Sequence, residues 1–498
     1  MMFFAELWER FCYYGMRALL AVYVAQLFMV AKADAALIYG AYTSLVYAVG
    51  IFGGYVADKV LGYRRSILLG GLIMAAGCFT LTLKDTNAFL WGLSLIVVGN
   101  GLFKPNISTL VGKLYAPGDP RRDGGFTIFY MGINIGALIA PLLCTAVSNW
   151  FPIEVTPAEL PPGFTPDPEQ ILPSGMILLP DYRWGFGMAG AGMLLGLVTF
   201  LLFRRTLGDK GLVPANRTSP VWFCAVLAGC AAATPGVYFL LARDDIATKL
   251  LLVLAGGMVS WFVTLGIKLI RAGDRAGGQR LFAFILLLAA NALFWASFEQ
   301  AGNSLNFFAR DHVSNPGWWK FTYFQSVNSG FIVLLGPVFA VLWVVLSRIG
   351  RNPSIPAKFG LALVQVGLGF LICNWAITMA GPDFRTPFVM LFLVYFIHTT
   401  GELCISPVGL SMVTKLAPAH MTGVAMGAWF LSIACGNNLA GILSSQAVGA
   451  LEKGEVTGAS ALAAYTTTYT SIAWFAIGAG ALYFLLSKPM NKLMHGIK

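Results

Sequence analysis

The sequence predicts an all-α polytopic membrane protein with fourteen transmembrane helices, and three observations support that fold class. Apolar residues make up 57% of the 498 positions and charged residues only 11%, and the mean hydropathy is +0.74. A soluble domain of this size needs a far more polar surface. The apolar residues also form long continuous runs, without the alternation that is typical of a membrane β-barrel.

Each run is long enough to cross a membrane, because a helix of roughly 20 residues spans a hydrocarbon core of about 30 Å. Charged residues or clusters of Pro and Gly separate the runs. The predicted helices cover residues 4–30, 36–57, 66–84, 88–115, 123–150, 183–204, 219–241, 247–268, 281–309, 321–347, 358–380, 386–414, 421–449 and 462–487.

The distribution of charge predicts the orientation. With the N-terminus inside, the cytoplasmic loops contain more than twice as many Lys and Arg residues as the external loops, whereas acidic residues are more frequent outside. This is the positive-inside pattern, and an even number of helices returns the C-terminus to the cytoplasm. We therefore expect an inner (cytoplasmic) membrane protein with both termini cytoplasmic. The net charge of +11 is then a topology signal rather than a sign of a nucleic-acid partner.

The cysteines and the start of the chain add two expectations. All eight cysteines fall within predicted helices and no pair has metal-ligand spacing, so we expect no metal site. The sequence opens without a cleavable signal peptide and reaches Glu6 at once, which suggests that residues are missing upstream.

The chain divides into two halves joined by a bridge. Residues 1–205 are predicted to form an N-terminal six-helix bundle, residues 281–498 a C-terminal six-helix bundle, and residues 206–280 a linker with two additional transmembrane helices. An internal repeat supports this division, because Pro and Lys are spaced eight apart at the end of the fourth helix of each half, at Pro105 with Lys113 and at Pro407 with Lys415. Two pseudo-equivalent bundles are typical of transporters.

Two loops have distinctive compositions. The loop after the second helix contains Asp58 and Arg64 in a G-x-x-x-D-K-x-x-G-x-R-R string, which resembles the major facilitator signature. Asp58 falls at a helix C-terminus, where the helix dipole disfavours a carboxylate unless a cation compensates it, so we expect both residues to act in gating. The proline-rich segment 151–181 is expected to be an extended external loop without a site.

Seven charged residues fall at membrane depth, where each costs about 2.5–3.5 kcal/mol on insertion scales. They must pair with one another or line a wet cavity. The spacing of the first three predicts one shared helix face. The seven are Glu6, Glu9, Arg10, Arg17, Lys104, Glu299 and Glu402.

Depth predicts which charges meet. Lys104 lies about 14 Å inside the cytoplasmic end of its helix, where it can meet the cluster on the first helix. Glu299 lies about 16 Å from the external end and can face Arg17 across the two bundles. Glu402 lies about 20 Å from the cytoplasmic end, one turn deeper than Lys104 and in the opposite half.

Simpler interpretations stay open for these residues. The charges on the first helix could be interfacial anchors that snorkel to water, and the deeper ones could form structural ion pairs. His398 fits a satisfied helix histidine better than a proton relay. Trp295 and Trp429 stand at helix centres, where either packing or a binding site explains them.

The motifs together resemble a known family. Glu6-Leu7-Trp8-Glu9-Arg10-Phe11-Cys12-Tyr13-Tyr14-Gly15 is similar to the E-x-x-E-R-F-x-Y-Y-G signature of the proton-dependent oligopeptide transporters, within the major facilitator superfamily. Three further motifs of that family are matched by Phe103-Lys104-Pro105-Asn106, by Phe294-Trp295 with Phe298-Glu299-Gln300, and by Gly401-Glu402 followed by Ser406-Pro407. Two extra helices between the halves are typical of bacterial members. One departure is Ser329, which follows Asn328 where the family has Pro.

The resemblance implies proton-coupled symport of di- and tripeptides by alternating access, with protons as the coupling ion and no cofactor. It implies a monomer in membrane lipid, with the peptide between the two bundles. The peptide carboxylate would face Arg10, Arg17 and Lys104, and its amine would face Glu402, Asn134 and Asn328. Tyr13, Tyr14 and Tyr47 would line the pocket, beside Trp295 and Trp429. The residues expected to couple protons are Glu6, Glu9, Arg10, Arg17, Lys104 and Glu299.

Three other functions compete with peptide transport. A drug exporter of the same fold would usually have an apolar pocket with one acidic residue, whereas this pocket should hold both signs of charge. A transporter of another anion, such as nitrate, conflicts with Glu402, which would repel the anion. A membrane enzyme lacks support, because the four histidines are far apart in the sequence and neither H-E-x-x-H nor a serine elbow occurs.

Overall fold

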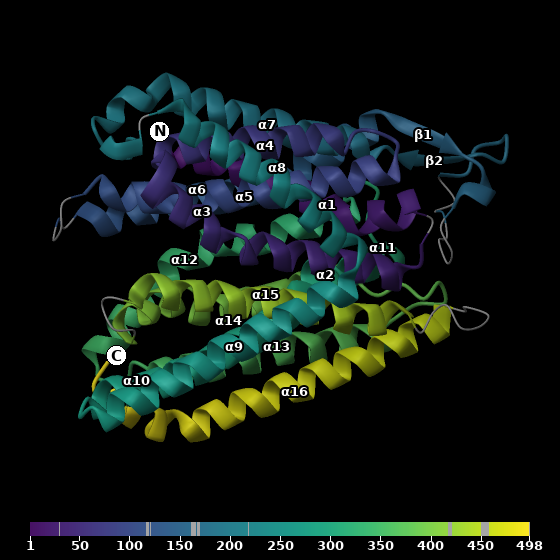
Figure 1. The fold of residues 1–498 in the computed structure, drawn as a ribbon. Helices are drawn as coiled ribbons and strands as arrows, with labels where there is room; N and C mark the ends of the chain where they lie inside the picture. Colours follow the sequence, from purple (N-terminus) through teal and green to yellow (C-terminus); the bar gives the residue numbers. More distant parts are fainter. Residues whose placement is uncertain are drawn as a thin grey trace. The chain divides into compact units, whose positions relative to one another are not determined.

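The computed structural model describes residues 1–28, 30–115, 119, 121–160, 166, 170–217, 219–416, 421–449 and 458–497, and most of them are helical. The helices form two compact units (Figure 1). The first unit comprises Met1–Asp244 and Trp319–Gly330, and the second comprises Asp245–Trp318 and Phe331–Lys498.

In the first unit, α1 packs against α6 and α7, and α4 packs against α5 and α7. The extra helix α8 also belongs to this unit and packs against α5. The helices are α1 (Met2–Phe28), α2 (Lys32–Ala48), α3 (Gly50–Val56), α4 (Tyr63–Thr80), α5 (Thr86–Lys113), α6 (Arg121–Trp150), α7 (Tyr182–Phe203) and α8 (Pro220–Ala242).

In the second unit, α13 packs against α14 and α16, and α10 packs against α15. Helix α12 contributes its first turns to the first unit and the rest to the second. The helices are α9 (Asp244–Arg271), α10 (Arg275–Phe298), α11 (Ser304–Asp311), α12 (Phe324–Arg348), α13 (Ile355–Thr378), α14 (Phe388–Leu416), α15 (Thr422–Gly449) and α16 (Gly458–Leu493).

The predicted helical membrane fold is confirmed. Within the described ranges, thirteen helical segments are long and apolar enough to cross a membrane. The span predicted at 66–84 corresponds to α4, which also forms a helix but is less apolar because it includes Arg64 and Arg65 in its first turn.

The span predicted at 36–57 is not one uninterrupted helix. It consists of α2, α3 and a π-helical turn at Ala57–Leu61. The interruption at Val49 lies against α5, because a Cβ atom on Gly101 would lie 2.7 Å from Val49 Cγ1. One turn further along α3, a Cβ atom on Gly53 would lie 1.8 Å from the Gly101 carbonyl oxygen. The Asn106 side chain donates a hydrogen bond to the Gly53 carbonyl oxygen at 3.0 Å. This tertiary contact fixes the path of α3 and is not evident from local hydropathy.

A β-hairpin in the loop between α6 and α7 was missed by the sequence analysis. Strands β1 (Pro152–Val155) and β2 (Ile177–Pro180) pair antiparallel, with Ile153 opposite Leu179. The many prolines of this segment obscure the strand pattern, because proline cannot donate to a strand ladder. Here a proline stands at an end of each strand, where the lost donor matters least.

Glycines allow α4 and α5 to pack closely. A Cβ atom on Gly99 would lie 2.6 Å from the Gly70 carbonyl oxygen, and one on Gly77 would lie 2.6 Å from that of Gly92. Small residues at such crossings let helix backbones approach each other, which is how membrane helices gain packing energy.

We predict that Gly99→Ala destabilises the protein by about 2 kcal/mol, because the added methyl group overpacks the contact with Gly70. Gly229→Ala in α8 is the matched control, since a Cβ atom there meets nothing within 4 Å and alanine is the better helix former. The thermal unfolding midpoint of the purified protein in detergent should fall for Gly99→Ala and stay level or rise for Gly229→Ala. Equal midpoints for the two variants would refute the packing argument.

Candidate functional site

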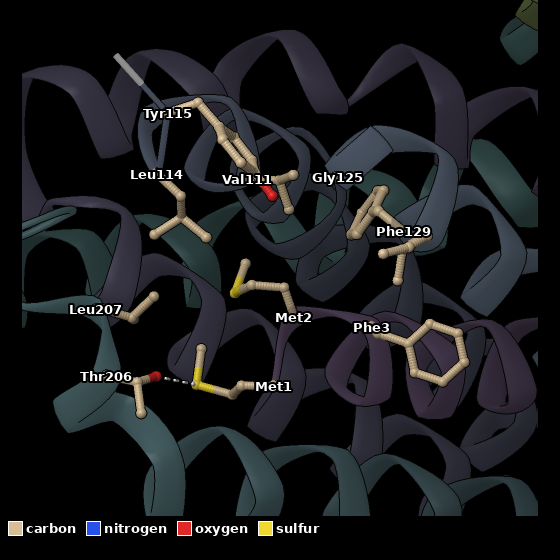
Figure 2. A pocket seen from close by; sticks show the side chains of 11 residues that line it. Met1, Met2, Phe3, Val111, Leu114, Tyr115, Gly125, Phe129, Thr206 and Leu207 are labelled. Atoms are coloured by element: carbon tan, nitrogen blue, oxygen red, sulfur yellow. Dashed lines mark hydrogen bonds between the residues drawn. The ribbon is translucent and has the colours of Figure 1, made fainter. Parts of the chain in front are cut away.

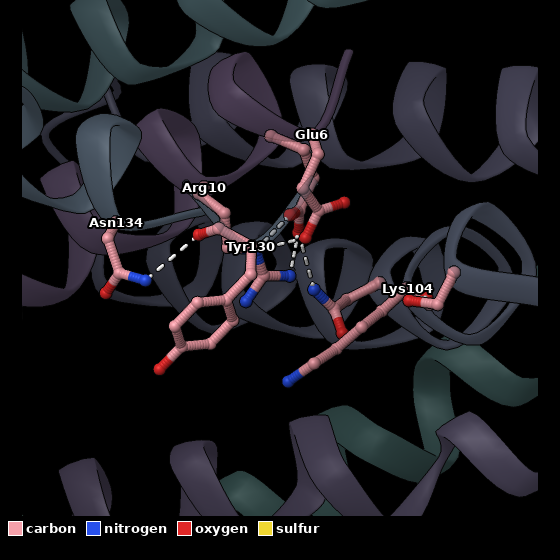
Figure 3. Close-up of polar contacts among 8 residues, drawn as sticks. Glu6, Arg10, Lys104, Tyr130 and Asn134 are labelled. Atoms are coloured by element: carbon pink, nitrogen blue, oxygen red, sulfur yellow. Dashed lines mark hydrogen bonds and ion pairs between the residues drawn. The ribbon is translucent and has the colours of Figure 1, made fainter. Parts of the chain in front are cut away.

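The charged residues near the start of α1 form one buried cluster (Figure 3). Arg10 Nη2 donates a hydrogen bond to Glu9 Oε1 at 2.6 Å, and Arg10 Nε also contacts Glu9 Oε2. Arg10 Nε lies 3.2 Å from Glu6 Oε1. The predicted shared face is therefore correct, and these residues pair with each other inside the protein rather than reaching to water.

Asn100 on α5 completes this cluster and was not identified from the sequence. Its Nδ2 atom donates to Glu9 Oε1 at 3.1 Å, and the residue is fully buried. Asn100 precedes Lys104 by four residues, so helical spacing from that lysine could have revealed it. On the other side of α1, a Cβ atom on Gly136 of α6 would lie 2.3 Å from the Leu7 carbonyl oxygen, so α6 fits closely against this part of α1.

Lys104 lies next to the predicted pocket residue Tyr47. Its Nζ atom is 3.7 Å from the centroid of the Tyr47 ring, a cation–π contact between α5 and α2. Tyr42, the nearby alternative, is completely buried, whereas Tyr47 is only half-buried. The expected pairing of Lys104 with the α1 charges stays a prediction.

Arg17 lies two turns along α1 and contacts aromatic rings. Its Nε atom donates to the Tyr39 hydroxyl at 2.5 Å, and its guanidinium lies 5.6 Å from the Tyr14 ring centroid and 5.9 Å from that of Tyr39. Tyr39 on α2 carries no sequence signal that links it to Arg17, and it was missed. The pairing of Arg17 with Glu299 stays a prediction.

The remaining site candidates of the first unit differ in exposure. Tyr13 is buried, 5.4 Å from the Arg10 guanidinium, whereas Tyr14 is half-buried. Asn134 on α6 is buried and donates from Nδ2 to the Tyr130 carbonyl oxygen at 3.0 Å. Asn328 lies on the first turns of α12 and is half-buried.

In the second unit, Glu299 stands at a break in the predicted helix 281–309. Helix α10 ends at Phe298, a single 3-10 turn covers Glu299–Gly302, and α11 begins at Ser304. The expectation that Glu299 lies in mid-helix is therefore wrong, although the residue is buried as predicted.

Gln300 holds the broken segment in place. Its Nε2 atom donates to the Ala440 carbonyl oxygen of α15 at 3.0 Å, and its Oε1 atom accepts from the hydroxyls of Ser304 at 2.6 Å and Ser444 at 2.9 Å. These side-chain hydrogen bonds connect the 3-10 turn to α15 and to the first residue of α11. They join segments far apart in the sequence, so hydropathy could not reveal the break.

A chain of hydrogen bonds connects the two candidate tryptophans. The Trp295 indole N–H donates to Asn291 Oδ1 at 3.0 Å, Asn291 Nδ2 donates to Ser432 Oγ at 2.8 Å, and Ser432 Oγ donates to the Trp429 carbonyl oxygen at 2.7 Å. Trp429 is buried, and Trp295 is half-buried. Asn291, one helical turn before Trp295, was missed although its spacing offered a signal.

Glu402 lies on α14 and is 9% exposed. His398, one turn earlier, is buried, and its Nε2 atom donates to the Val366 carbonyl oxygen of α13 at 3.1 Å. This contact agrees with the interpretation of His398 as a packed helix histidine.

The two expected gating residues have local partners. Asp58 accepts a hydrogen bond from the Tyr63 hydroxyl. Arg64 donates to the carbonyl oxygens of Lys210, at 2.7 Å, and of Gly208. Arg64 thus holds the segment that follows α7 against the signature loop, and a gating role for either residue stays a prediction.

The first unit contains a small cavity near the start of α1 (Figure 2). It measures about 240 Å³ and is mainly apolar, lined by the start of α1, the end of α5 and part of α6. Met1 receives a hydrogen bond on its sulfur from the Thr206 hydroxyl. None of the predicted site residues lines this cavity, so it does not represent the expected peptide site.

Comparison with known families agrees with the motifs. Residues 64–461 match the family described as the POT family. The chain belongs to the POT family. The resemblance stated from the sequence is thereby confirmed.

Individual members of the POT family are similar over nearly their whole length. The peptide transporter YePEPT of Yersinia enterocolitica is 34% identical, over 89% of this chain and 86% of the relative. The dipeptide and tripeptide permease B of Xenorhabdus bovienii is 33% identical, over 88% and 85%. A crystal structure of a POT peptide transporter in complex with sulfate matches with 33% identity and a TM-score of 0.77, over 99% of this chain and 95% of that one.

We predict that Arg10→Met destabilises the protein by about 3 kcal/mol or more, because Glu6 and Glu9 would lose their shared partner while remaining buried. The double variant Glu9→Gln with Arg10→Met should regain part of this loss, since it removes one of the stranded charges. As a control, Lys249→Met breaks an exposed ion pair with Asp245 and should change stability by less than about 1 kcal/mol. Thermal unfolding in detergent measures all three. A double variant less stable than Arg10→Met would contradict mutual compensation in the cluster.

Proposed function

We propose that this chain imports di- and tripeptides together with protons. One observation carries the proposal: a POT-family chain buries Arg10 against two carboxylates on its first helix. Relatives over nearly the full length are named peptide transporter and dipeptide and tripeptide permease. Their names also favour peptides over the drugs or inorganic anions considered from the sequence.

A free peptide carries a carboxylate at one end and an amine at the other, and both must be compensated when water is removed. In the proposed site, Arg10, Arg17 and Lys104 bind the carboxylate, and Glu402 with Asn134 and Asn328 binds the amine. Trp295 and Trp429, together with Tyr13, Tyr14 and Tyr47, provide the rings around the peptide. Aromatic surfaces tolerate varied side chains better than fixed polar groups do.

The geometry of Arg10 suggests how protons are coupled to peptide binding. Two carboxylates already engage its guanidinium, so a peptide carboxylate competes with them. Protonation of Glu6 or Glu9 removes that competitor, and Arg10 then binds the peptide. Glu6 Oε2 is buried and accepts no hydrogen bond from the part of the chain that the structure describes, which makes it a suitable atom to receive the proton. By linkage, peptide binding then favours proton binding equally.

The proposed location is the inner membrane, as a monomer with both termini in the cytoplasm. Support comes from the thirteen apolar helices of the described segments and from the concentration of Lys and Arg in alternate loops. The POT family is a transporter family, and the chain acts in this proposal without a cofactor and without enzymatic activity.

We predict that Glu402→Gln weakens dipeptide binding by at least tenfold, because the peptide amine loses its charged partner. An N-acetylated dipeptide, which has no charged amine, should bind weakly to the parent and lose little further affinity in the variant. Competition against a radiolabelled dipeptide measures both ligands. If free and acetylated dipeptides compete equally with the parent, Glu402 does not bind the amine.

We predict that Glu299→Gln retains peptide exchange across the membrane but loses the ability to accumulate peptide. Glutamine imitates the protonated carboxyl, and it would remove the attraction to Arg17 that we expect to hold the external side closed. The variant should exchange peptide for peptide in proteoliposomes, which requires no net proton movement, but should fail to concentrate peptide under a proton gradient. Accumulation at the parental level would exclude Glu299 and leave coupling to Glu6 and Glu9.

A further inference from the structure

A second cavity lies wholly within the second unit and has a different chemistry from the proposed peptide site. It measures about 700 Å³ and is lined by the end of α12 and the connection to α13, the start of α13, the C-terminal half of α14, and the end of α16 with the segment that follows it. No carboxylate is among its lining residues. The polar residues that line it are Ser347, Asn352, Ser354, Lys358, Ser411, Lys415 and Asn491.

Lys358 is the unusual member of this lining. Its side chain is only 7% exposed, and it makes no ion pair or side-chain hydrogen bond with the described residues. Its Nζ atom lies 4.2 Å from the centroid of the Trp343 ring. A cation–π contact is favourable but weaker than what a buried ammonium group needs to replace its hydration. Lys358 therefore presents a poorly compensated positive charge to the cavity.

The residues that line the cavity include two lysines but no Asp or Glu. The nearest acidic residue before them on α14 is Glu402, five positions before Pro407, and it does not line the cavity. Lysines and arginines in cytoplasmic loops set the orientation of the protein in the membrane, and they can do so while exposed to water. That explanation covers the exposed Arg348 and Lys488, but it does not account for a buried lysine such as Lys358.

The start of α13 adds a second contribution to the positive potential. Ser354 stands at the N-cap, and its side chain makes no capping hydrogen bond. The first backbone N–H groups of a helix have no partner within the helix, and they carry the positive end of its dipole. Pro356 has no N–H and the Lys358 N–H donates to the Ser354 carbonyl oxygen. Because Ile355 lines the cavity, its N–H is the donor of this turn that lies at the wall, together with the Lys358 side chain.

We propose that this cavity binds a phosphate group, either in the headgroup of an anionic phospholipid or as free phosphate. A phosphate accepts hydrogen bonds on several oxygens, which suits the ammonium groups of Lys358 and Lys415 and the hydroxyls of Ser354 and Ser411. In the proposed orientation this end faces the cytoplasmic leaflet, where anionic lipids attract basic pockets between helices. The residues are separate from those proposed to bind peptide, so the two proposals can fail independently.

The test titrates the purified full chain in neutral detergent with three ligands: short-chain phosphatidylglycerol, phosphatidylcholine of the same chain length, and inorganic phosphate. The readouts are the thermal unfolding midpoint and the mass of bound ligand in native mass spectrometry. Phosphatidylglycerol should bind saturably and raise the midpoint, and phosphatidylcholine should not. If inorganic phosphate gives the same stabilisation and displaces the lipid, the ligand is free phosphate; if it does neither, the ligand is the lipid headgroup.

Substitutions locate the binding site. Lys358→Met keeps most of the side-chain volume but removes the charge, and it should weaken binding about tenfold. Lys488→Met is the matched control, because Lys488 is exposed at the same end and does not line the cavity, and it should bind like the parent. If Lys358→Met fails to fold, Lys415→Met at the exposed rim should still weaken binding several-fold. The proposal is overturned if neither phosphatidylglycerol nor inorganic phosphate binds, if phosphatidylcholine binds equally well, or if the cavity variants bind as tightly as the parent.

Discussion

Burial of charge in a medium that cannot hydrate it is the constraint on which the first unit depends. Arg10 finds its partners within its own helix, where it pairs with Glu6 and Glu9. The second carboxylate is then anchored to α5 through Asn100. The charges would each carry a large desolvation cost if they were buried alone, but here they form a contact between helices. The net charge of the cluster depends on whether Glu6 and Glu9 are protonated. Protonation of Glu6 or Glu9 can therefore release Arg10 to bind a different carboxylate.

The second unit uses neutral hydrogen bonds for the same purpose of fixing buried polar groups. Gln300 bonds the end of α10 to α15, and Asn291 connects Trp295 to α15 through Ser432. These networks hold the candidate residues in defined positions without adding charge. Glu299 and Glu402 are therefore conspicuous as the acidic side chains buried in this part of the described structure.

Much of the architecture could be predicted from the sequence because lipid demands long apolar helices and makes each buried charge conspicuous. The face shared by Glu6, Glu9 and Arg10 followed from helical spacing alone. The break at Glu299 and the interruption near Gly53 could not be predicted in this way, since each depends on contacts with residues distant in the sequence. Asn100 and Asn291 could have been predicted, because they lie one helical turn before Lys104 and Trp295. Tyr39 could not, because nothing in the sequence links it to Arg17.

Proton movement driven by peptide is the most direct test of proton-coupled peptide import. Purified protein in proteoliposomes, with no imposed gradient and a pH-sensitive dye outside, would receive a dipeptide in the external buffer. We expect the external pH to rise as peptide and protons enter together, and we expect the N-acetylated dipeptide to produce little change. Entry of labelled dipeptide without any change of pH would contradict the coupling, and absence of entry would contradict peptide transport itself.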